Sequence, residues 1–264
     1  MKKRADVLLS LQEASLSREK AQKLIMEGRV YAGEVRISKA SDMVDEETKL
    51  TVRGEENPFA SRGGHKLEKA ITAFNADVSG LVCMDIGAAA GGFTDVLLRH
   101  GAGHVYAVDV GYGQMDWALR NDPRVTVMER TNARGLTEES VPLGPTLTVM
   151  DVSFISIRLL LPVLAGIMGE NGRFLTLIKP QFEAGRGQVG KNGVVRESEI
   201  HRRVLTEIRD FCPSFGWSMR DVTFSPIKGP KGNIEFLADI RPGDADVVSD
   251  ETIRSVVEQA HKEL

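Results

Sequence analysis

The sequence predicts an α/β protein whose main part is a doubly wound, mostly parallel sheet, preceded by a small α+β domain. Three observations lead to this prediction. From residue 82 to residue 211, apolar strand-like runs alternate with helical segments, as they do when helices connect parallel strands. The first fifty residues follow a different pattern, with two short helices before a set of short strands. A length of 264 residues is typical of two domains.

The N-terminal segment is predicted to contain two short helices and then strands. Apolar residues at helical spacing indicate the first helix, and Ser17 is suited to cap a second helix that Gly28 ends. Residues 30–35 have the pattern of a tight hairpin, and residues 50–52 that of a closing strand. The apolar positions of the two helices are Ala5, Leu8, Leu9, Ala21, Leu24 and Ile25.

This segment resembles the S4-like RNA-binding fold, which occurs in a ribosomal protein and in several RNA-modifying enzymes. The likeness rests on residues 4–9, 17–21, 24–30 and Gly33. Ala32 departs from the family, which usually has Asn before this turn glycine. The resemblance implies that the N-terminal segment binds RNA.

The distribution of charge is consistent with a local nucleic-acid-binding surface. A net charge of −3 and a pI near 6.0 argue against a protein that coats nucleic acid through bulk positive charge. Residues 1–40 nevertheless have an excess of basic side chains, and residues 41–56 an excess of acidic ones. Such segregation suits a phosphate-facing surface, although two ordinary solvated faces would have the same pattern. The candidate RNA-binding residues of this segment are Arg4, Arg18, Lys20 and Lys23.

We expect the N-terminal domain to span residues 1–55, a linker marked by Pro58 to span 56–60, and a larger domain to span 61–264. In the larger domain the last two strands are close in sequence, which indicates an antiparallel hairpin at the sheet edge, followed by an amphipathic helix. The predicted elements are strand 82–86, helix 91–100, strands 104–110, 125–128 and 146–150, helix 157–168, strand 174–178, helix 197–211, strands 221–225 and 234–240, and helix 252–264.

The sequence also favours a cytoplasmic protein without a metal ion. Its apolar runs are shorter than the ~20 residues of a membrane span, and no apolar stretch with a cleavage site follows the basic start. Cys83 and Cys212 lie far apart, with the spacing of neither a disulfide framework nor a metal site. The sequence indicates no particular oligomeric state.

A glycine-rich loop at the first strand–helix junction of the larger domain predicts a cofactor site. Ligands of open α/β sheets bind beyond the carboxyl ends of the strands, where glycine lets the backbone approach closely. Asp109, at the end of the second strand, is suited to accept both hydroxyls of a ribose. Asn132 either contacts an adenine or caps a turn. The candidate cofactor-binding residues are Asp85, Gly87, Ala88, Gly91, Gly92, Phe93, Asp109, Val110, Asn132 and Asp151.

A dinucleotide is the competing cofactor, because its fold also has a glycine turn and a distal acid. Two features oppose it. The loop does not have the G-x-G-x-x-G pattern, and Asp85 precedes its first glycine. Without a pyrophosphate to bind, Asp85 suits the amino-acid end of S-adenosylmethionine.

Motifs along nearly the whole chain resemble the TlyA family, whose members are often labelled hemolysins. These proteins look like FtsJ-type ribose 2′-O-methyltransferases with an S4-like domain in front. The resemblance implies a Rossmann-like class I methyltransferase sheet and methylation of cytidine in ribosomal RNA. Two departures are Ala89-Ala90, in place of a common Ser-Thr pair, and residues 58–60, in place of a more typical aromatic and basic linker. The motifs are residues 61–67, 85–95, 109–114, 151–156, 179–183 and 232–236.

The resemblance also implies a catalytic tetrad of Lys66, Asp151, Lys179 and Glu235. Asp151 and Lys179 follow apolar strands, so we expect both at the ligand-binding edge of the sheet. Transfer needs the hydroxyl aligned with the methyl–sulfonium bond and its proton removed or redirected. Because a free lysine titrates at ~10.4, Lys179 is a poor base unless burial or a second cation lowers its pKa, and a lysine nearby could be that cation. The alternative is four unrelated surface charges.

Two other segments are candidates for RNA contacts. Residues 183–196 combine glycines with basic residues and suit either a lid that grips phosphates or a flexible connector. Lys228 and Lys231 lie in a Gly/Pro turn, which is otherwise an ordinary solvated turn. The candidate RNA-binding residues of the larger domain are Arg62, Arg186, Lys191, Lys228 and Lys231.

The sequence therefore predicts an S-adenosylmethionine-dependent enzyme that acts on ribosomal RNA or ribosomal subunits. One alternative is a non-catalytic ribosome-binding or assembly factor, against which the intact tetrad and the acidic cofactor residues count. Another is a membrane-lysing hemolysin, which would need an apolar span or a basic amphipathic helix that the sequence does not show.

Overall fold

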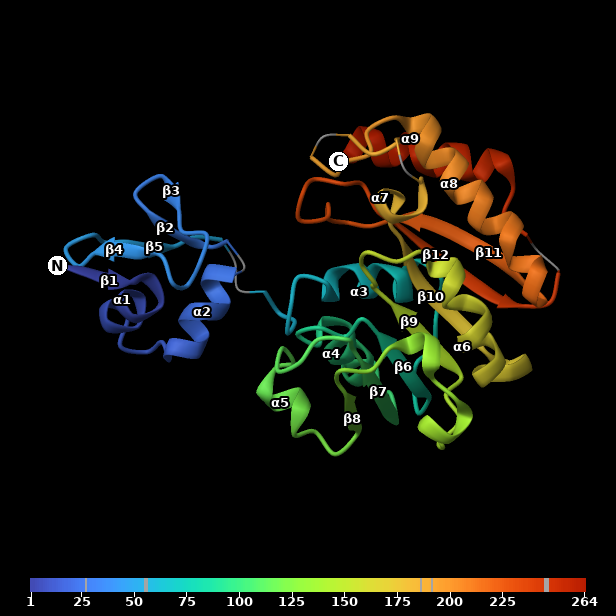
Figure 1. Cartoon of the computed structure of the whole chain (residues 1–264), viewed down its shortest axis with the longest axis horizontal. Coiled ribbons are helices and arrows are strands. Elements are labelled where there is room, and N and C mark those ends of the chain that lie inside the picture. Colours follow the sequence, from blue (N-terminus) through green and yellow to red (C-terminus); the bar gives the residue numbers. More distant parts are fainter. Residues whose placement is uncertain (27, 55–56, 186, 191, 245–246) are drawn as a thin grey trace. The chain divides into compact units, whose positions relative to one another are not determined.

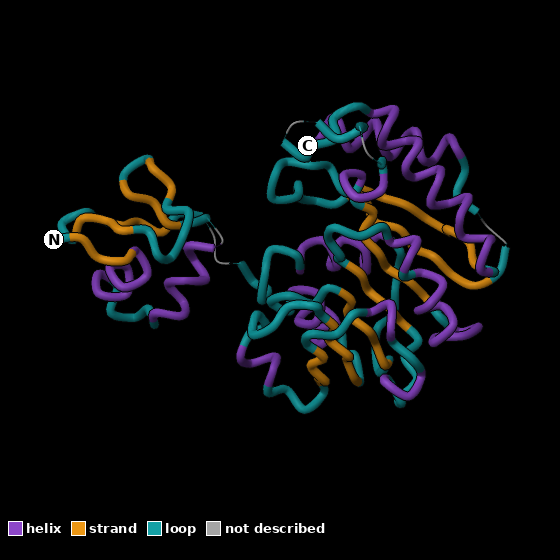
Figure 2. Tube along the Cα trace, in the orientation of Figure 1, coloured by secondary structure: helices purple, strands orange, loops and turns teal. Residues whose placement is uncertain are grey.

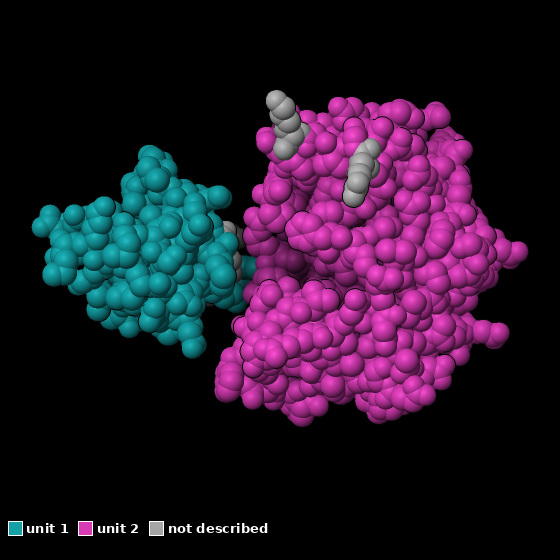
Figure 3. Space-filling view, in the orientation of Figure 1, with its two compact units in different colours: residues 1–58 teal, residues 59–264 magenta. Residues whose placement is uncertain are grey.

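The computed structural model describes residues 1–26, 28–54, 57–185, 187–190, 192–244 and 247–264. It divides into two compact units, residues 1–58 and residues 59–264 (Figure 3). The division falls inside the predicted linker 56–60, since Phe59 packs in the core of the second unit and the Ala60 N–H donates to Asp95. The exact bounds proposed from the sequence, 1–55, 56–60 and 61–264, stay a prediction.

The described residues of the first unit form two helices and two small antiparallel sheets (Figure 1). As predicted, Ser17 caps the second helix, since its Oγ accepts the Lys20 N–H at 3.1 Å, and Gly28 follows the helix with a φ of +72°. The pair β1–β4 was not predicted from the sequence. The elements are β1 (Lys2–Arg4), α1 (Ala5–Gln12), α2 (Arg18–Met26), β2 (Val30–Ala32), β3 (Val35–Arg36), β4 (Met43–Asp45) and β5 (Leu50–Val52).

The second unit is built on a seven-stranded sheet in the order β11-β12-β10-β9-β6-β7-β8 (Figure 1). The five strands from β10 to β8 run parallel, while β12 is antiparallel to β10 and β11 to β12. The predicted parallel sheet and its edge hairpin are confirmed. The strands are β6 (Val82–Ile86), β7 (His104–Val108), β8 (Val125–Met128), β9 (Leu147–Met150), β10 (Arg173–Ile178), β11 (Trp217–Phe224) and β12 (Phe236–Pro242).

Helices cover both faces of this sheet (Figure 2), because strands buried on both sides present apolar residues alternately to each. Met84 and Ile86 belong to the core on the side of α6, α8 and α9, whereas Cys83 belongs to the core on the side of α3 and α4. The helices are α3 (Gly64–Ala73), α4 (Gly92–Arg99), α5 (Trp117–Arg120), α6 (Leu161–Met168), α7 (Pro180–Glu183), α8 (Ser198–Phe211) and α9 (Asp250–Glu263).

Helix α3 was not predicted, although Leu67, Ala70 and Ile71 are spaced as on one helical face and are buried. Two glycines at its start obscured the pattern. Gly64 is needed there for packing, because a Cβ on it would lie 2.5 Å from the Phe59 ring. The helix matters because it carries Lys66.

The strand register brings the candidate residues to one edge of the sheet. Ile86 is paired with both Val108 and Met150, so β6, β7 and β9 end side by side. The residue after each parallel strand therefore lies at this carboxyl edge. Glu235, just before the antiparallel β12, reaches the same edge from the opposite direction.

Candidate active site

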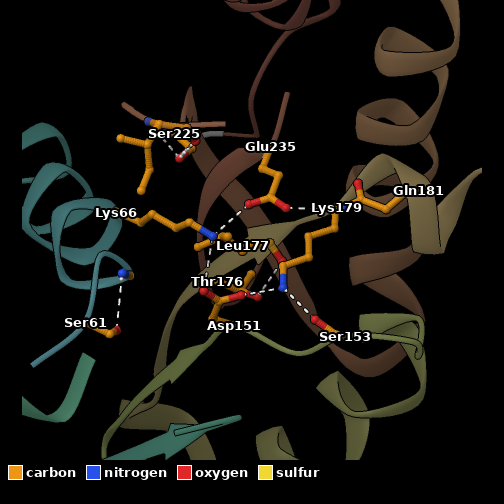
Figure 4. A network of polar contacts seen from close by, with 12 residues as sticks. Ser61, Lys66, Asp151, Ser153, Thr176, Leu177, Lys179, Gln181, Ser225 and Glu235 are labelled. Carbon is orange, nitrogen blue, oxygen red and sulfur yellow. Dashed lines mark hydrogen bonds and ion pairs between the residues drawn. The ribbon is translucent and has the colours of Figure 1, made fainter. Parts of the chain in front are cut away.

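Four charged side chains that are distant in sequence meet at the carboxyl edge of the sheet (Figure 4). The Lys66 Nζ lies 2.7 Å from Glu235 Oε2 and 3.2 Å from Asp151 Oδ2. The Lys179 Nζ lies 2.5 Å from Asp151 Oδ1. Asp151 thus bridges two ammonium groups, and the structure brings together the four residues that the sequence proposed as a tetrad.

A different element positions each member of this cluster. Lys66 comes from α3, and Asp151 directly follows β9, where its N–H donates to the carbonyl of Ile86 at 3.0 Å. Lys179 directly follows β10 and precedes Pro180, which begins α7. Glu235 is held at the start of β12, where its carbonyl accepts the N–H of Ser225. Rigid elements thus fix the separation of the four side chains.

The cluster is largely shielded from water, with Lys66 7%, Lys179 8% and Glu235 1% exposed. Burial alone would lower the pKa of Lys66, but the carboxylates of Asp151 and Glu235 outweigh it and raise that pKa. Burial likewise opposes ionisation of Asp151, yet the two lysines outweigh it and lower its pKa. Lys66 is therefore held as a cation and suits a positioning role.

Two neutral side chains that were not predicted from the sequence also belong to the network. The Lys179 ammonium donates to the Ser153 hydroxyl at 3.0 Å, and the Gln181 amide donates to Glu235 Oε1 at 3.1 Å (Figure 4). Each lies two residues beyond a tetrad member, in a motif already noted for its neighbour. Their position close to a tetrad member in sequence is the feature from which both could have been predicted.

A cavity of about 380 Å³ opens beside Asp151 at the ends of β6, β7 and β9. Five of the candidate cofactor residues line it: Gly87, Asp109, Val110, Asn132 and Asp151. Both Asp109 oxygens accept backbone N–H groups, from Ala89 at 2.8 Å and Gly111 at 2.6 Å. Asn132 caps a turn, by accepting the Arg134 N–H, and also lines the cavity.

The other candidate cofactor residues lie outside this lining: Asp85, Ala88, Gly91, Gly92 and Phe93. Phe93 is part of the core. A Cβ on Gly91 would lie 2.4 Å from Leu119 Cδ1, and one on Gly92 would lie 2.2 Å from Ser61 Oγ. These two glycines let the loop pack against the protein itself, whereas from the sequence we expect them to allow a close approach to a ligand.

Asp85 is fully buried beneath the loop. Its Oδ2 accepts the Thr94 N–H at 2.9 Å and the Thr94 hydroxyl at 2.7 Å, which fixes the start of α4. Its Oδ1 has no hydrogen-bond partner among the described residues. Burial raises the pKa of Asp85 to about 7. A buried carboxylate oxygen without a hydrogen-bond partner is suited to bind a proton or a ligand cation.

Phe154 is a further residue that the sequence argument did not single out. It lines the cavity, is 90% exposed and has a φ of +65°, which bulky residues rarely adopt. Its ring lies 5.1 Å from that of Phe182. An exposed ring held in a strained conformation beside Ser153 is suited to stack with a nucleobase.

The candidate RNA-binding residues of the second unit differ in exposure and in position. Arg62 and Lys231 are exposed and Lys228 is half-buried. The turn that carries both lysines packs on the tetrad, since a Cβ on Gly229 would lie 2.5 Å from Glu235 Oε1. Arg186 and Lys191 lie outside the described residues.

In the first unit, Arg4 and Arg18 have a structural role that composition did not reveal. Both are ion-paired with the fully buried Asp6, at 3.0 and 3.1 Å, and Gln22 also donates to it. The Arg4 hydrogen bond is the main cause that holds the pKa of Asp6 well below its usual range. Lys20 is exposed and Lys23 half-buried on the same helix, α2.

Comparisons with known proteins agree with this architecture. The FtsJ-like methyltransferase family matches residues 59–240, and the S4 domain matches residues 3–50. The 16S/23S rRNA (cytidine-2′-O)-methyltransferase TlyA of Mycobacterium tuberculosis is 42% identical over 98% of this chain and 97% of its own length. Hemolysin A of Brachyspira hyodysenteriae is 43% identical over 84% of this chain and 92% of its own length.

A solved structure from Streptococcus thermophilus is also similar, with a TM-score of 0.79 and 46% identity over 99% of this chain and 96% of that one. The likeness thus extends over both units. Among the residues that the structure describes, no helix has the length and apolar character needed to cross a membrane.

Proposed function

The chain belongs to the TlyA family of FtsJ-like methyltransferases, and on this basis we propose that it methylates a ribose 2′-hydroxyl of cytidine in ribosomal RNA. The convergence of Lys66, Asp151, Lys179 and Glu235 beside the cavity carries the proposal. A non-catalytic assembly factor would not need two buried lysines and two carboxylates in one network. Action on ribosomal RNA implies a cytoplasmic enzyme.

The residues around the cavity fit S-adenosylmethionine, which supplies an electrophilic methyl group when bound. A volume of about 380 Å³ is typical of small-ligand sites. Asp109 lies where a ribose binds in such folds, and the buried Oδ1 of Asp85 suits an ammonium group. Val108, Ala133 and Leu160 form an apolar wall that suits an adenine.

We assign the substrate hydroxyl to Lys179, because both of its polar partners, Asp151 and Ser153, line the cavity. Lys66 is ion-paired with Asp151 and keeps its carboxylate in place, and Glu235 in turn holds Lys66. Lys179 is thereby aimed at the hydroxyl. As an ammonium it donates to the hydroxyl oxygen and orients it, and as a neutral amine it accepts the hydroxyl proton. Precise placement of this kind supplies much of the rate of group transfer.

The assignment of Asp85 leads to a prediction about protons. If the ammonium group of the cofactor lies beside Asp85, binding at pH 7 should release protons, because a nearby cation favours the ionised carboxylate and lowers a pKa of about 7. Calorimetry in buffers of different ionisation enthalpy measures the release. Asp85→Asn should bind without releasing protons, and so should the native protein with methylthioadenosine, which lacks the amino-acid end.

Binding of S-adenosylmethionine without proton release would mean that Asp85 serves only to hold Thr94 and α4.

The raised pKa of Asp85 also affects the stability of the folded protein. Because the folded pKa exceeds the ordinary value of 3.8, the stability that Asp85 contributes to the cofactor-free protein is lost as the pH rises through about 7.

The proposed function is tested by incubating the protein with labelled S-adenosylmethionine and ribosomal subunits that lack the modification. We expect label in ribosomal RNA, in a nucleotide whose 3′ linkage resists alkaline cleavage because its 2′-oxygen is methylated. Mapping then identifies the nucleotide. Binding to subunits without transfer would favour the assembly factor, and label on a base would contradict ribose chemistry.

We also propose that the N-terminal unit binds RNA through α2. Reversing the charge of Arg4 or Arg18 would disturb the buried Asp6, so Lys20 and Lys23 give a cleaner test. Lys20→Gln with Lys23→Gln should weaken RNA binding and reduce the salt slope by about two, since each phosphate contact contributes about one. Lys49→Gln, an exposed lysine in the acidic segment, is the control. An unchanged slope in the double variant would assign the domain another role.

A further inference from the structure

A buried carboxylate connects the two segments that carry the proposed catalytic residues. Glu183 ends α7, the helix that follows Lys179, and is 6% exposed. Its Oε2 accepts the Ser156 hydroxyl at 2.6 Å, and its Oε1 accepts the Ile157 N–H at 2.8 Å. Ser156 ends the loop that begins with Asp151, and Ile157 begins the short 3₁₀ helix that follows it. Glu183 therefore joins the segment after β10 to the segment after β9.

The loop that Glu183 holds is fixed at both of its ends. At the first, the Asp151 N–H donates to Ile86 of β6 at 3.0 Å. At the other, the loop is attached to Glu183. Between them lie Ser153, which accepts from Lys179, and Phe154 with its φ of +65°. Strained backbone of this kind persists only where the surroundings enforce it.

Glu183 is buried, and both of its carboxyl oxygens accept hydrogen bonds from the loop. Burial raises the pKa of Glu183 above its ordinary value, while hydrogen bonds from Ser156 and Ile157 and the nearby Arg158 favour the ionised form. The Arg158 Nε lies 3.6 Å from Glu183 Oε2, and its Nη2 donates to the Glu183 carbonyl. An apolar side chain would fill the same space without holding the loop.

Glu183 neither lines the cavity nor contacts a tetrad member through any interaction described above. We propose that Glu183 is a positioning residue, which fixes the loop 151–156 against α7 and so sets where Ser153 and Phe154 stand relative to Lys179. The inference rests on the proposed function. A displacement of about 1 Å at a reacting group reduces a rate by about 10²-fold, so a contact of this kind has a measurable effect on transfer.

The test compares Glu183→Gln and Ser156→Ala with Asp239→Asn. Asp239 is the matched control, because it is 2% exposed and ion-paired with Arg173 and Arg241 but belongs to the interior of β12. Glu183→Gln keeps the size of the side chain and replaces an acceptor with an amide that donates. We expect single-turnover transfer to ribosomal subunits to fall by roughly 10²-fold, with affinity for S-adenosylmethionine and for subunits within about twofold.

Ser156→Ala removes one donor and should reduce transfer by roughly 10-fold, and it tests the proposal if Glu183→Gln does not fold. The double variant should lose no more than Glu183→Gln alone, because both changes break the same contact. Asp239→Asn should lower the melting temperature while transfer per folded molecule stays within about twofold.

Normal transfer by both variants would overturn the positioning role. So would a loss of cofactor affinity in proportion to the loss of rate, or an equal loss in Asp239→Asn, since either result would indicate a general structural role. Lys179→Ala, measured in parallel, separates the two proposals. If it stays active, the tetrad assignment fails; if it is inactive while Glu183→Gln is normal, only the role of Glu183 fails.

Discussion

Lys179→Ala should reduce methyl transfer to ribosomal subunits by roughly 10²–10⁴-fold, the usual range for a lost acid–base group. Affinity for S-adenosylmethionine should stay within about twofold, because Lys179 does not line the cavity and Asp151 keeps its second partner, Lys66. Single-turnover transfer and calorimetry measure the two quantities. Lys69→Ala is the control, since Lys69 is a half-buried lysine of the same unit that packs on the Phe224 ring.

Lys179→Arg distinguishes proton handling from simple positive charge. A guanidinium keeps the ion pair with Asp151 but does not give up its proton, so we expect a loss almost as large as that of the Ala variant. Near-normal methylation by the Arg variant would show that the residue supplies only charge, and the assigned role would be wrong.

Asp151→Asn is expected to have the largest effect on stability and to abolish transfer as well. Asp151 is the shared partner of Lys66 and Lys179, and its side chain is 19% exposed. Removing one partner of a buried ion pair leaves an uncompensated charge and typically costs about 3–5 kcal/mol of unfolding free energy. Denaturant unfolding at pH 7 measures this cost.

A second variant shows whether the cost comes from charge. Adding Lys179→Gln to Asp151→Asn removes the ammonium group that has lost its carboxylate, whereas Lys66 keeps Glu235 as a partner, so part of the unfolding free energy should return while transfer stays absent. If the double variant is less stable than Asp151→Asn by the full cost of Lys179→Gln alone, the two side chains contribute independently to stability, and the proposed coupling between them is wrong.

The cost of Asp151→Asn should also depend on pH in a defined way. The folded pKa of Asp151 is lowered, so its contribution is present above the ordinary value of 3.8 and is lost as the pH falls through the folded pKa. The folded pKa of Lys66 is raised, so its contribution is present below 10.5 and is lost as the pH rises through the folded pKa. Between pH 5 and pH 9 the cost should therefore be nearly constant.

The sequence by itself determined the class of fold, and its motifs led to the four residues that we propose as a tetrad. The alternation of strands and helices is a local property of the chain, and so are the helix cap at Ser17 and the turn at Gly28. Such features can be predicted without knowledge of any contact between distant residues. The tetrad came from resemblance, and the parallel-sheet pattern explained why Asp151 and Lys179 share one edge.

Tertiary structure alone decided which contacts those residues make. Periodicity does not reveal that Gly92 faces Ser61 or that Arg4 and Arg18 are ion-paired with Asp6. Nor does it reveal that Asp151 and Glu235 raise the pKa of Lys66. Each depends on the register and packing of elements far apart in sequence. Glu183 is the clearest case, because its partners follow another strand, and only the pairing of β9 with β10 brings them within hydrogen-bonding distance.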